Sequence, residues 1–447
     1  MALFMKDSLK GKTSRVVFAS YLAFLAVMPF GEMPLLGTRE VFTVTKAAFL
    51  FLMAGLAWAA IRGWRPRMAP AVYGVLALFL AGTLAAALFS LDMRHSIVAW
   101  VRVPSMVMLG LATFWLVDEE RGRARVICWW CLGLAAIFSA LGIYQTMTGS
   151  TIANFGYYSV FGRLMSVAVS DVPGSVTLVR ASATFDHPGF FGNYLALILP
   201  FGVLMLDGRR WSDLRTWGLV AVLVAGMLAL VCTLSRGAWL GMAAALVVIG
   251  IGRASARIGW VIFAAAFALA LVLIPADTRP ILISRSHQTQ YYDGTRLVSY
   301  QTAMRILVRH PLLGIGPDMF NRMFKLYAPP GIKIRQNPAH HMDAHNTFLD
   351  LGAETGAAGL LPFLAILGWG MVRVCRLARP CSMCGESSPA DDRLLALALA
   401  AALAAFVIQS VFLSLEYQEI FWVILGIIVA VILPSDRGNT TQTMRRN

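Results

Sequence analysis

Long apolar runs separated by short polar loops recur from one end of the chain to the other. Most of these runs approach the roughly 20 residues that a helix needs to cross a bilayer. The pattern predicts an all-α, polytopic membrane protein with about twelve transmembrane helices, in a single membrane domain over residues 1–447. The predicted spans are residues 16–30, 41–61, 69–89, 97–117, 126–144, 190–206, 214–232, 238–251, 258–274, 347–374, 394–413 and 420–433.

Composition and charge agree with this class. The chain is 58% hydrophobic and 14% charged, whereas a soluble domain has about 25% charged residues. The formal net charge is +15, and the basic residues gather before the first span and in the short loops after even-numbered spans, as the positive-inside bias predicts. Both termini are therefore expected in the cytoplasm, and the charge needs no nucleic-acid partner.

Two longer segments, residues 145–189 and 275–346, fall on the opposite, periplasmic side in this topology. Loops longer than about fifteen residues are usually functional or disordered. The second loop, between the ninth and tenth spans, contains a predicted amphipathic helix that ends at Pro311, with Leu297 and Met304 on one side. Both segments are rich enough in apolar and aromatic residues that we expect them to lie on the outer membrane surface.

The six cysteines do not make a disulfide framework. Cys128, Cys131 and Cys232 lie inside apolar spans and are predicted to fill the core. Cys381 and Cys384 form a CxxC pair, but a structural zinc site needs four ligands and no second pair lies in reach. The role of this pair stays open.

Two arginines stand at the ends of apolar runs. The stretch 217–251 is too long for one crossing, so the chain is predicted to turn back near Arg236. The Arg236 guanidinium either snorkels to the membrane surface or holds a phosphate through two hydrogen bonds. Arg180 precedes the sixth span, where Asp186 either caps that helix and pairs with Arg180 or belongs to a binding site.

The segment AHHMDAHNTFLD, residues 339–350, holds three of the seven histidines. His341 and His345 have the i, i+4 spacing of a metal pair, although the HExxH motif of metalloproteases is absent. Asp343 or Asn346 can instead cap the helix that follows. A third interpretation makes His345 a general base, because a neutral imidazole at the membrane surface can take a proton from a substrate hydroxyl.

Glu354 lies about two turns into the tenth predicted span. An ionisable group inside a membrane helix suggests a function by default, and otherwise pairs with an arginine or hydroxyl of a neighbouring helix. The sequence contains neither G-x-S-x-G nor GxxxxGK[ST], so it supports neither a typical α/β-hydrolase nor a P-loop ATPase.

Four segments resemble one known family: RASATFDHPGFFGNYLALILP, TLSRGAWLG, GTRLVSYQTAMRILVRHPLLGIGPDMF and AHNTFLDLGAETGAAGLL. In order, spacing and membrane position they are similar to the O-antigen ligase and polymerase superfamily of bacterial membrane glycosyltransferases. The resemblance covers roughly residues 180 to 365. It departs from the commoner family pattern at His187, where an asparagine is expected before the proline.

The resemblance implies a glycosyltransferase at the periplasmic face of the bacterial inner membrane that uses neither metal nor nucleotide. Its donor would be a glycan on undecaprenyl diphosphate, and its acceptor a lipid A-core sugar or another saccharide. The family's histidine before asparagine corresponds to His345, the implied general base. The implied diphosphate ligands are Arg180, Arg236 and Arg296, and we place Asn346, Asp186, Glu354 and His341 beside them as supporting residues.

This chemistry suits these residue types. Arginines stabilise a departing diphosphate without a metal, and a general base is worth roughly 10²–10⁴-fold in rate. A single direct displacement inverts the anomeric centre. Two alternatives stay open: a polymerase that uses the same donor, and a transporter or flippase of lipid-linked glycan. A transporter needs charged residues along a midplane pathway, whereas the notable arginines here are expected at the outer face.

Overall fold

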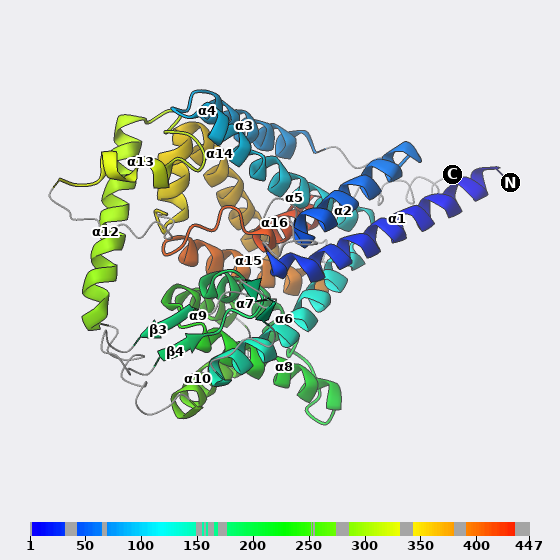
Figure 1. Cartoon of the computed structure of the whole chain (residues 1–447). Helices are drawn as coiled ribbons and strands as arrows, with labels where there is room; N and C mark the ends of the chain where they lie inside the picture. Colours follow the sequence, from blue (N-terminus) through cyan, green and yellow to red (C-terminus); the bar gives the residue numbers. More distant parts are fainter. Residues whose placement is uncertain are drawn as a thin grey trace.

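The computed structural model describes residues 2–31, 43–64, 69–148, 154–155, 158–159, 165–168, 177–251, 253, 255–273, 286–330, 343–379 and 390–433. Over these residues the chain is a bundle of apolar helices (Figure 1). The helices before the first long loop are α1 (Ala2–Val27), η1 (Met28–Phe30), α2 (Val44–Ile61), α3 (Pro70–Leu88), α4 (Met93–Trp100), α5 (Arg102–Glu119) and α6 (Gly122–Thr148). The later ones are α7 (Pro188–Leu204), α8 (Leu214–Cys232), α9 (Arg236–Gly250), α10 (Ser255–Leu273), α12 (Ser286–Arg309), α13 (Phe320–Tyr327), α14 (Thr347–Ala378), α15 (Ala390–Ser410) and α16 (Glu419–Ile432).

Among the described residues, seven helical segments are long and apolar enough to cross a membrane, and five further apolar helical segments are shorter. The chain is thus a helical, multi-pass membrane protein. The helices lie close to the predicted spans. For example, α8 coincides with the predicted span 214–232, and α14 begins at the first residue of the predicted span 347–374. The count of about twelve crossings and the sidedness of the loops stay predictions.

The structure corrects the sequence-based picture in three places. The predicted span 97–117 is divided at Val101 into α4 and α5, just before Arg102 and Pro104 interrupt the apolar run. The long helix α14 contains a kink at Gly356, whose φ of 59° is left-handed. The loop 145–189, to which the sequence assigned no helix or strand, holds two short antiparallel pairs, β1 (Asn154–Phe155) with β2 (Tyr158–Ser159), and β3 (Met165–Ala168) with β4 (Thr177–Arg180).

Most buried apolar side chains form one core that runs through the bundle. It includes Cys128, Cys131 and Cys232, which confirms that these cysteines are core residues. A second, smaller core lies beneath α12 and α13, where Ile306 and Phe324 pack together. In Figure 1, α12 lies at the end of the bundle opposite the start of α1. A helix is therefore present where the sequence predicted one, and it forms a helical cover at that end with α13. Leu297 and Met304, on the side predicted to be apolar, are exposed, and α12 packs instead through Ala303 and Ile306.

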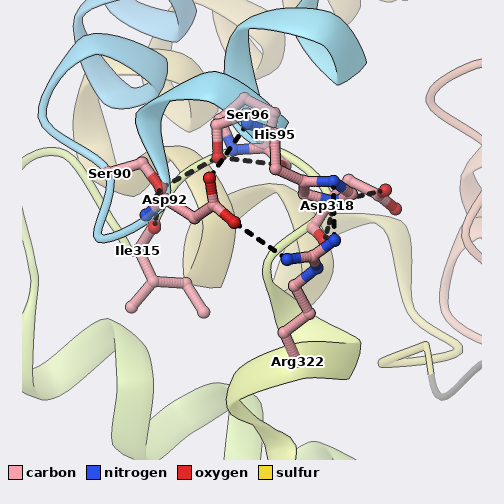
Figure 2. Close-up of polar contacts among 8 residues, drawn as sticks. Ser90, Asp92, His95, Ser96, Ile315, Asp318 and Arg322 are labelled. Atoms are coloured by element: carbon pink, nitrogen blue, oxygen red, sulfur yellow. Dashed lines mark hydrogen bonds and ion pairs between the residues drawn. The ribbon is translucent and has the colours of Figure 1, made fainter.

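A polar network fastens this helical cover to the turn between α3 and α4 (Figure 2). The imidazole Nε2 of His95 lies 2.9 Å from Oδ2 of Asp318, and Nη1 of Arg322 donates to Oδ2 of Asp92 at 2.8 Å. Ser90 Oγ donates to the Ile315 carbonyl at 2.9 Å. Because α3 and α4 belong to the bundle, these contacts fix where α12 and α13 lie above it.

Candidate functional site

The turn between α8 and α9 confirms the predicted reversal of the chain. It consists of residues 233–235, and Leu234 has a left-handed φ of 51°. Arg236 is the first residue of α9 and its side chain is exposed. Arg180, at the end of β4, donates from Nε to the Thr233 carbonyl at 2.8 Å. The two predicted diphosphate ligands are thus joined through one turn.

The start of α7 is capped by His187 and not by Asp186. His187 Nδ1 accepts from the Gly189 amide at 2.9 Å, so this nitrogen carries no proton. Asp186 is exposed, and its carboxylate lies against Gly31, which follows η1. The expectation that Asp186 caps this helix was wrong, because the imidazole one residue later is placed to accept the amide.

His345 lies directly before α14 in an unusual backbone conformation. Its φ is 51°, a left-handed value that costs a non-glycine residue energy. Tyr300 on α12 donates to the Val411 carbonyl at 2.8 Å and lies 3.4 Å from the His345 carbonyl. The helical cover therefore contacts the backbone of the proposed base and stabilises its strained conformation.

Asn346 begins α14 as the sequence indicated. Its Oδ1 accepts from the Phe348 and Leu349 amides at 3.0 and 3.1 Å, and its Nδ2 donates to the Val411 carbonyl at 3.3 Å. Thr347 Oγ1 donates to the Leu413 carbonyl at 2.8 Å. A side-chain cap and the turn after α15 together fix the chain on the C-terminal side of His345.

The turn after α15, residues 411–415, organises the whole site. A Cβ atom on Gly189 would lie 2.7 Å from Leu413 Cδ1, and one on Gly237 would lie 3.0 Å from Phe412 Cβ. The two glycines therefore let the starts of α7 and α9 pack closely against this turn. With the contacts from Asn346 and Thr347, it joins the starts of α7, α9 and α14 in one place.

The electrostatics link several of the predicted residues. Burial and the positive charges of Arg180, protonated His345 and Arg296 together lower the pKa of His187 to about 3, and Asp343 partly offsets this shift. Burial likewise lowers the pKa of His345, which Asp343 partly offsets and Arg296 reinforces. Both imidazoles are thus neutral near pH 7 in a positively charged surrounding, which suits an anionic ligand beside an uncharged base.

This shift gives a testable pH dependence of stability. An unfolded histidine has a pKa near 6.5, while that of His187 is about 3 in the fold. As the pH falls below about 6.5, His187 therefore binds a proton in the unfolded chain but not in the folded chain, and the free energy of unfolding decreases. We expect His187→Asn, which retains a good N-cap, to remove about 2 kcal/mol of the loss that the wild type suffers between pH 7.5 and 5.

Reversible unfolding in detergent micelles at the two pH values measures this term. The comparison is the difference between wild type and His187→Asn at each pH, which cancels the contribution of every other titrating group. An identical pH dependence in both proteins would show that His187 is protonated as readily in the fold as in the unfolded chain.

Glu354 has a structural partner of a kind that the sequence did not indicate. It is buried in α14, and its Oε1 accepts from the Phe320 amide at 3.2 Å, at the start of α13. The backbone nearby is tied as well, because the Gly316 amide donates to the Glu354 carbonyl at 2.8 Å. Glu354 thus holds the helical cover onto α14. Its partner is the Phe320 backbone amide, whereas the sequence suggested an arginine or a hydroxyl of a neighbouring helix.

Replacing Glu354 separates this acceptor role from its charge. Glu354→Ala leaves the buried Phe320 amide without its acceptor, which should cost about 1–3 kcal/mol and speed hydrogen exchange across residues 315–327. Glu354→Gln keeps an oxygen acceptor, so we expect it to retain most of the protection. Equal loss of protection in both variants would contradict this assignment.

The structure tests the remaining predicted residues unevenly. Arg296 on α12 acts electrostatically on both imidazoles, and its role as a diphosphate ligand stays a prediction. His340, His341, Cys381 and Cys384 lie outside the described residues, so the spacing of His341 and His345 and the CxxC pair stay predictions. Sequence reasoning missed the roles of His187 and the turn 411–415, although Gly189 and Gly237 were available signals of close packing.

Fold and site together define a multi-pass helical membrane protein with a histidine and arginine site at the helix starts. Residues 220–364 match the family model described as O-antigen ligase. This part of the chain carries Arg236, Arg296 and His345, and the predicted resemblance to the O-antigen ligase and polymerase superfamily is confirmed. This match supports an enzyme of the O-antigen ligase or polymerase type. No curated protein sequence matches it.

Proposed function

We propose that this protein is an O-antigen ligase-type glycosyltransferase that moves a glycan from undecaprenyl diphosphate to a lipid A-core sugar or another saccharide. The supporting observation is that the starts of α7, α9 and α14 meet at the turn 411–415. This places Arg236 and His345 close to that turn, and Arg180 is tied to the adjacent Thr233 carbonyl. Arginines bind a diphosphate through paired hydrogen bonds, and a partly buried neutral imidazole accepts a proton. The site lies in the periplasm in the topology that we propose.

In the proposed reaction the acceptor hydroxyl oxygen attacks the anomeric carbon of the donor sugar. The bond from that carbon to the diphosphate oxygen breaks, and its electron pair leaves with the diphosphate. Arg180, Arg236 and Arg296 stabilise the negative charge that develops there. His345 takes the hydroxyl proton and later returns it to water. One displacement of this kind inverts the anomeric configuration.

Tyr300 and Asn346 have positioning roles in this scheme. Both contact the Val411 carbonyl, which lies beside the His345 backbone. The left-handed conformation of His345 is thereby fixed before any substrate binds. Such preorganisation reduces the entropy that the reacting groups lose in the transition state.

Glycolipids of a deletion strain distinguish the ligase from its alternatives. A ligase leaves long polymer stranded on undecaprenyl diphosphate, whereas loss of a polymerase leaves single repeats attached to the acceptor. Donor retained on the cytoplasmic side of the membrane would instead indicate a transporter. We expect stranded polymer.

A further inference from the structure

A hollow between four helices lies away from the proposed transfer site. It has a volume of about 300 Å³ and is lined by residues of α3, α5, α14 and α16. Its mouth is formed by Ala71 and Ala365, which are exposed, and its floor by buried residues that include Phe114 and Ile366. The hollow is therefore a groove that opens at the side of the bundle, where a multi-pass protein meets lipid.

Backbone contacts explain why this groove exists. A Cβ atom on Gly82 would lie 2.1 Å from the Ala358 carbonyl oxygen, so α3 and α14 are in backbone contact there. The hollow lies further along both helices, between Ala71 and Ala365. In the floor, a Cβ atom on Gly426 would lie 2.4 Å from the Gly110 carbonyl oxygen. At this glycine pair α5 and α16 are thus in backbone contact, and neither residue sends a side chain into the hollow.

The chemistry of the lining selects a hydrocarbon. Every lining residue is apolar or a tryptophan, and the indole Nε1 of Trp422 already donates to the Glu416 carbonyl at 2.9 Å. A hollow of this size with so few hydrogen-bond partners does not hold water well, but it accepts apolar molecules. A polar headgroup or a sugar would lose its hydrogen bonds on entering.

Aromatic side chains mark the depth of the groove. Trp115, beside Phe114 of the floor, donates from Nε1 to Tyr73 Oη at 2.8 Å and packs edge-on against Trp64. Tryptophan and tyrosine gather at the headgroup level of membranes. One end of the groove thus lies near an interface, and the groove runs inward from it.

We propose that this groove binds one acyl chain of a membrane phospholipid. A lipid that enters from the adjacent headgroup region keeps its polar group at the level of the aromatic residues and places its acyl chain between α3 and α14. Ala365 and His345 lie on opposite sides of the Gly356 kink in α14, and none of the residues that line the groove belongs to the transfer site, so the two sites are separate. A chain bound there would fill the wedge between α3 and α14 and hold the helix that carries the transfer site.

Photo-crosslinking in nanodiscs tests this proposal. The full-length protein is reconstituted with a phosphatidylethanolamine that carries a diazirine in one acyl chain, and crosslinked peptides are mapped. We expect the label to concentrate on residues 71–76 and 365–369. Ala365→Phe and Ala71→Phe each place a ring in the mouth without removing packing, because both alanines are exposed. Each should lower the labelling about tenfold, as expected from losing the burial of about two methylene groups.

Ala77→Phe is the matched control, since Ala77 is exposed on α3 outside the groove. It should leave the labelling unchanged. Label spread evenly over exposed apolar residues such as Leu78, or equal labelling in all variants, would overturn the proposal. Displacement of the probe by an equimolar polyprenyl phosphate, but not by unlabelled phospholipid, would also overturn it, because the occupant would then be an isoprenoid chain.

Discussion

His345→Asn should abolish glycan transfer while the protein stays folded and still binds its donor. Asparagine tolerates the left-handed conformation that His345 adopts at φ 51°, so the backbone is preserved and only the imidazole is lost. Removing a general base should lower the turnover rate by roughly 10²–10⁴-fold. The measurement is the rate of glycan transfer to the acceptor by purified protein at saturating donor.

Two further variants sharpen this result. His187→Asn makes the same replacement at the other partly buried imidazole, and we expect it to retain transfer because the Nδ1 of His187 serves as a helix cap. His345→Ala should be as inactive as His345→Asn but less stable, since alanine fits a left-handed conformation poorly. Transfer by His345→Asn at the wild-type rate would exclude His345 as the base.

The pH profile of the wild type gives an independent reading. Burial lowers the pKa of His345, so the imidazole stays neutral below the pH at which a free histidine is protonated. The acid limb of kcat/KM should therefore have its midpoint below about 6.5. The His345 variants are expected to be inactive and so give no pH profile. The comparison is therefore between the wild type and His187→Asn.

Arg236→Lys should weaken the use of donor without disturbing the fold. The Arg236 side chain is exposed at the first position of α9, so lysine retains the charge but loses the planar fork that binds two diphosphate oxygens. Losing a charge-assisted hydrogen bond costs about 1.5–3 kcal/mol, which corresponds to roughly 10- to 150-fold in kcat/KM. Steady-state kinetics with varied donor concentration measure this loss.

Arg215→Lys is the control, because Arg215 is an exposed arginine at the opposite end of α8. We expect its kinetics to match the wild type. An Arg236→Lys protein with unchanged kcat/KM would show that Arg236 only anchors the end of α9 at the membrane surface.

The sequence alone predicted the spans well because each is a long apolar run whose ends carry charge or Pro. The reversal at Arg236 followed from length, and the cap at Asn346 from its position before α14. The break at Val101 was missed, although Arg102 follows it directly and Pro104 stands in the first turn of α5, where a proline signals a helix start. For α7 the sequence left open whether Asp186 caps the helix, since carboxylates are common caps, and it gave no signal for a cap by the His187 imidazole.

The convergence of the site depended on contacts between segments far apart in sequence. Residues 411–415 have no catalytic residue type, yet their carbonyls accept from Tyr300, Asn346 and Thr347. Such backbone acceptors leave no signature in sequence. Glu354 shows the converse case, because an intramembrane carboxylate suggested chemistry and the structure places it against the Phe320 amide.

The most direct test reconstitutes the purified protein in liposomes with a synthetic glycan on undecaprenyl diphosphate and a saccharide acceptor. Glycan on the acceptor and free undecaprenyl diphosphate are measured together. We expect the wild type to form them in equal amounts and His345→Asn to form neither. Donor that crosses the bilayer chemically unchanged, or equal product formation by His345→Asn, would contradict a glycosyltransferase that uses His345 as its base.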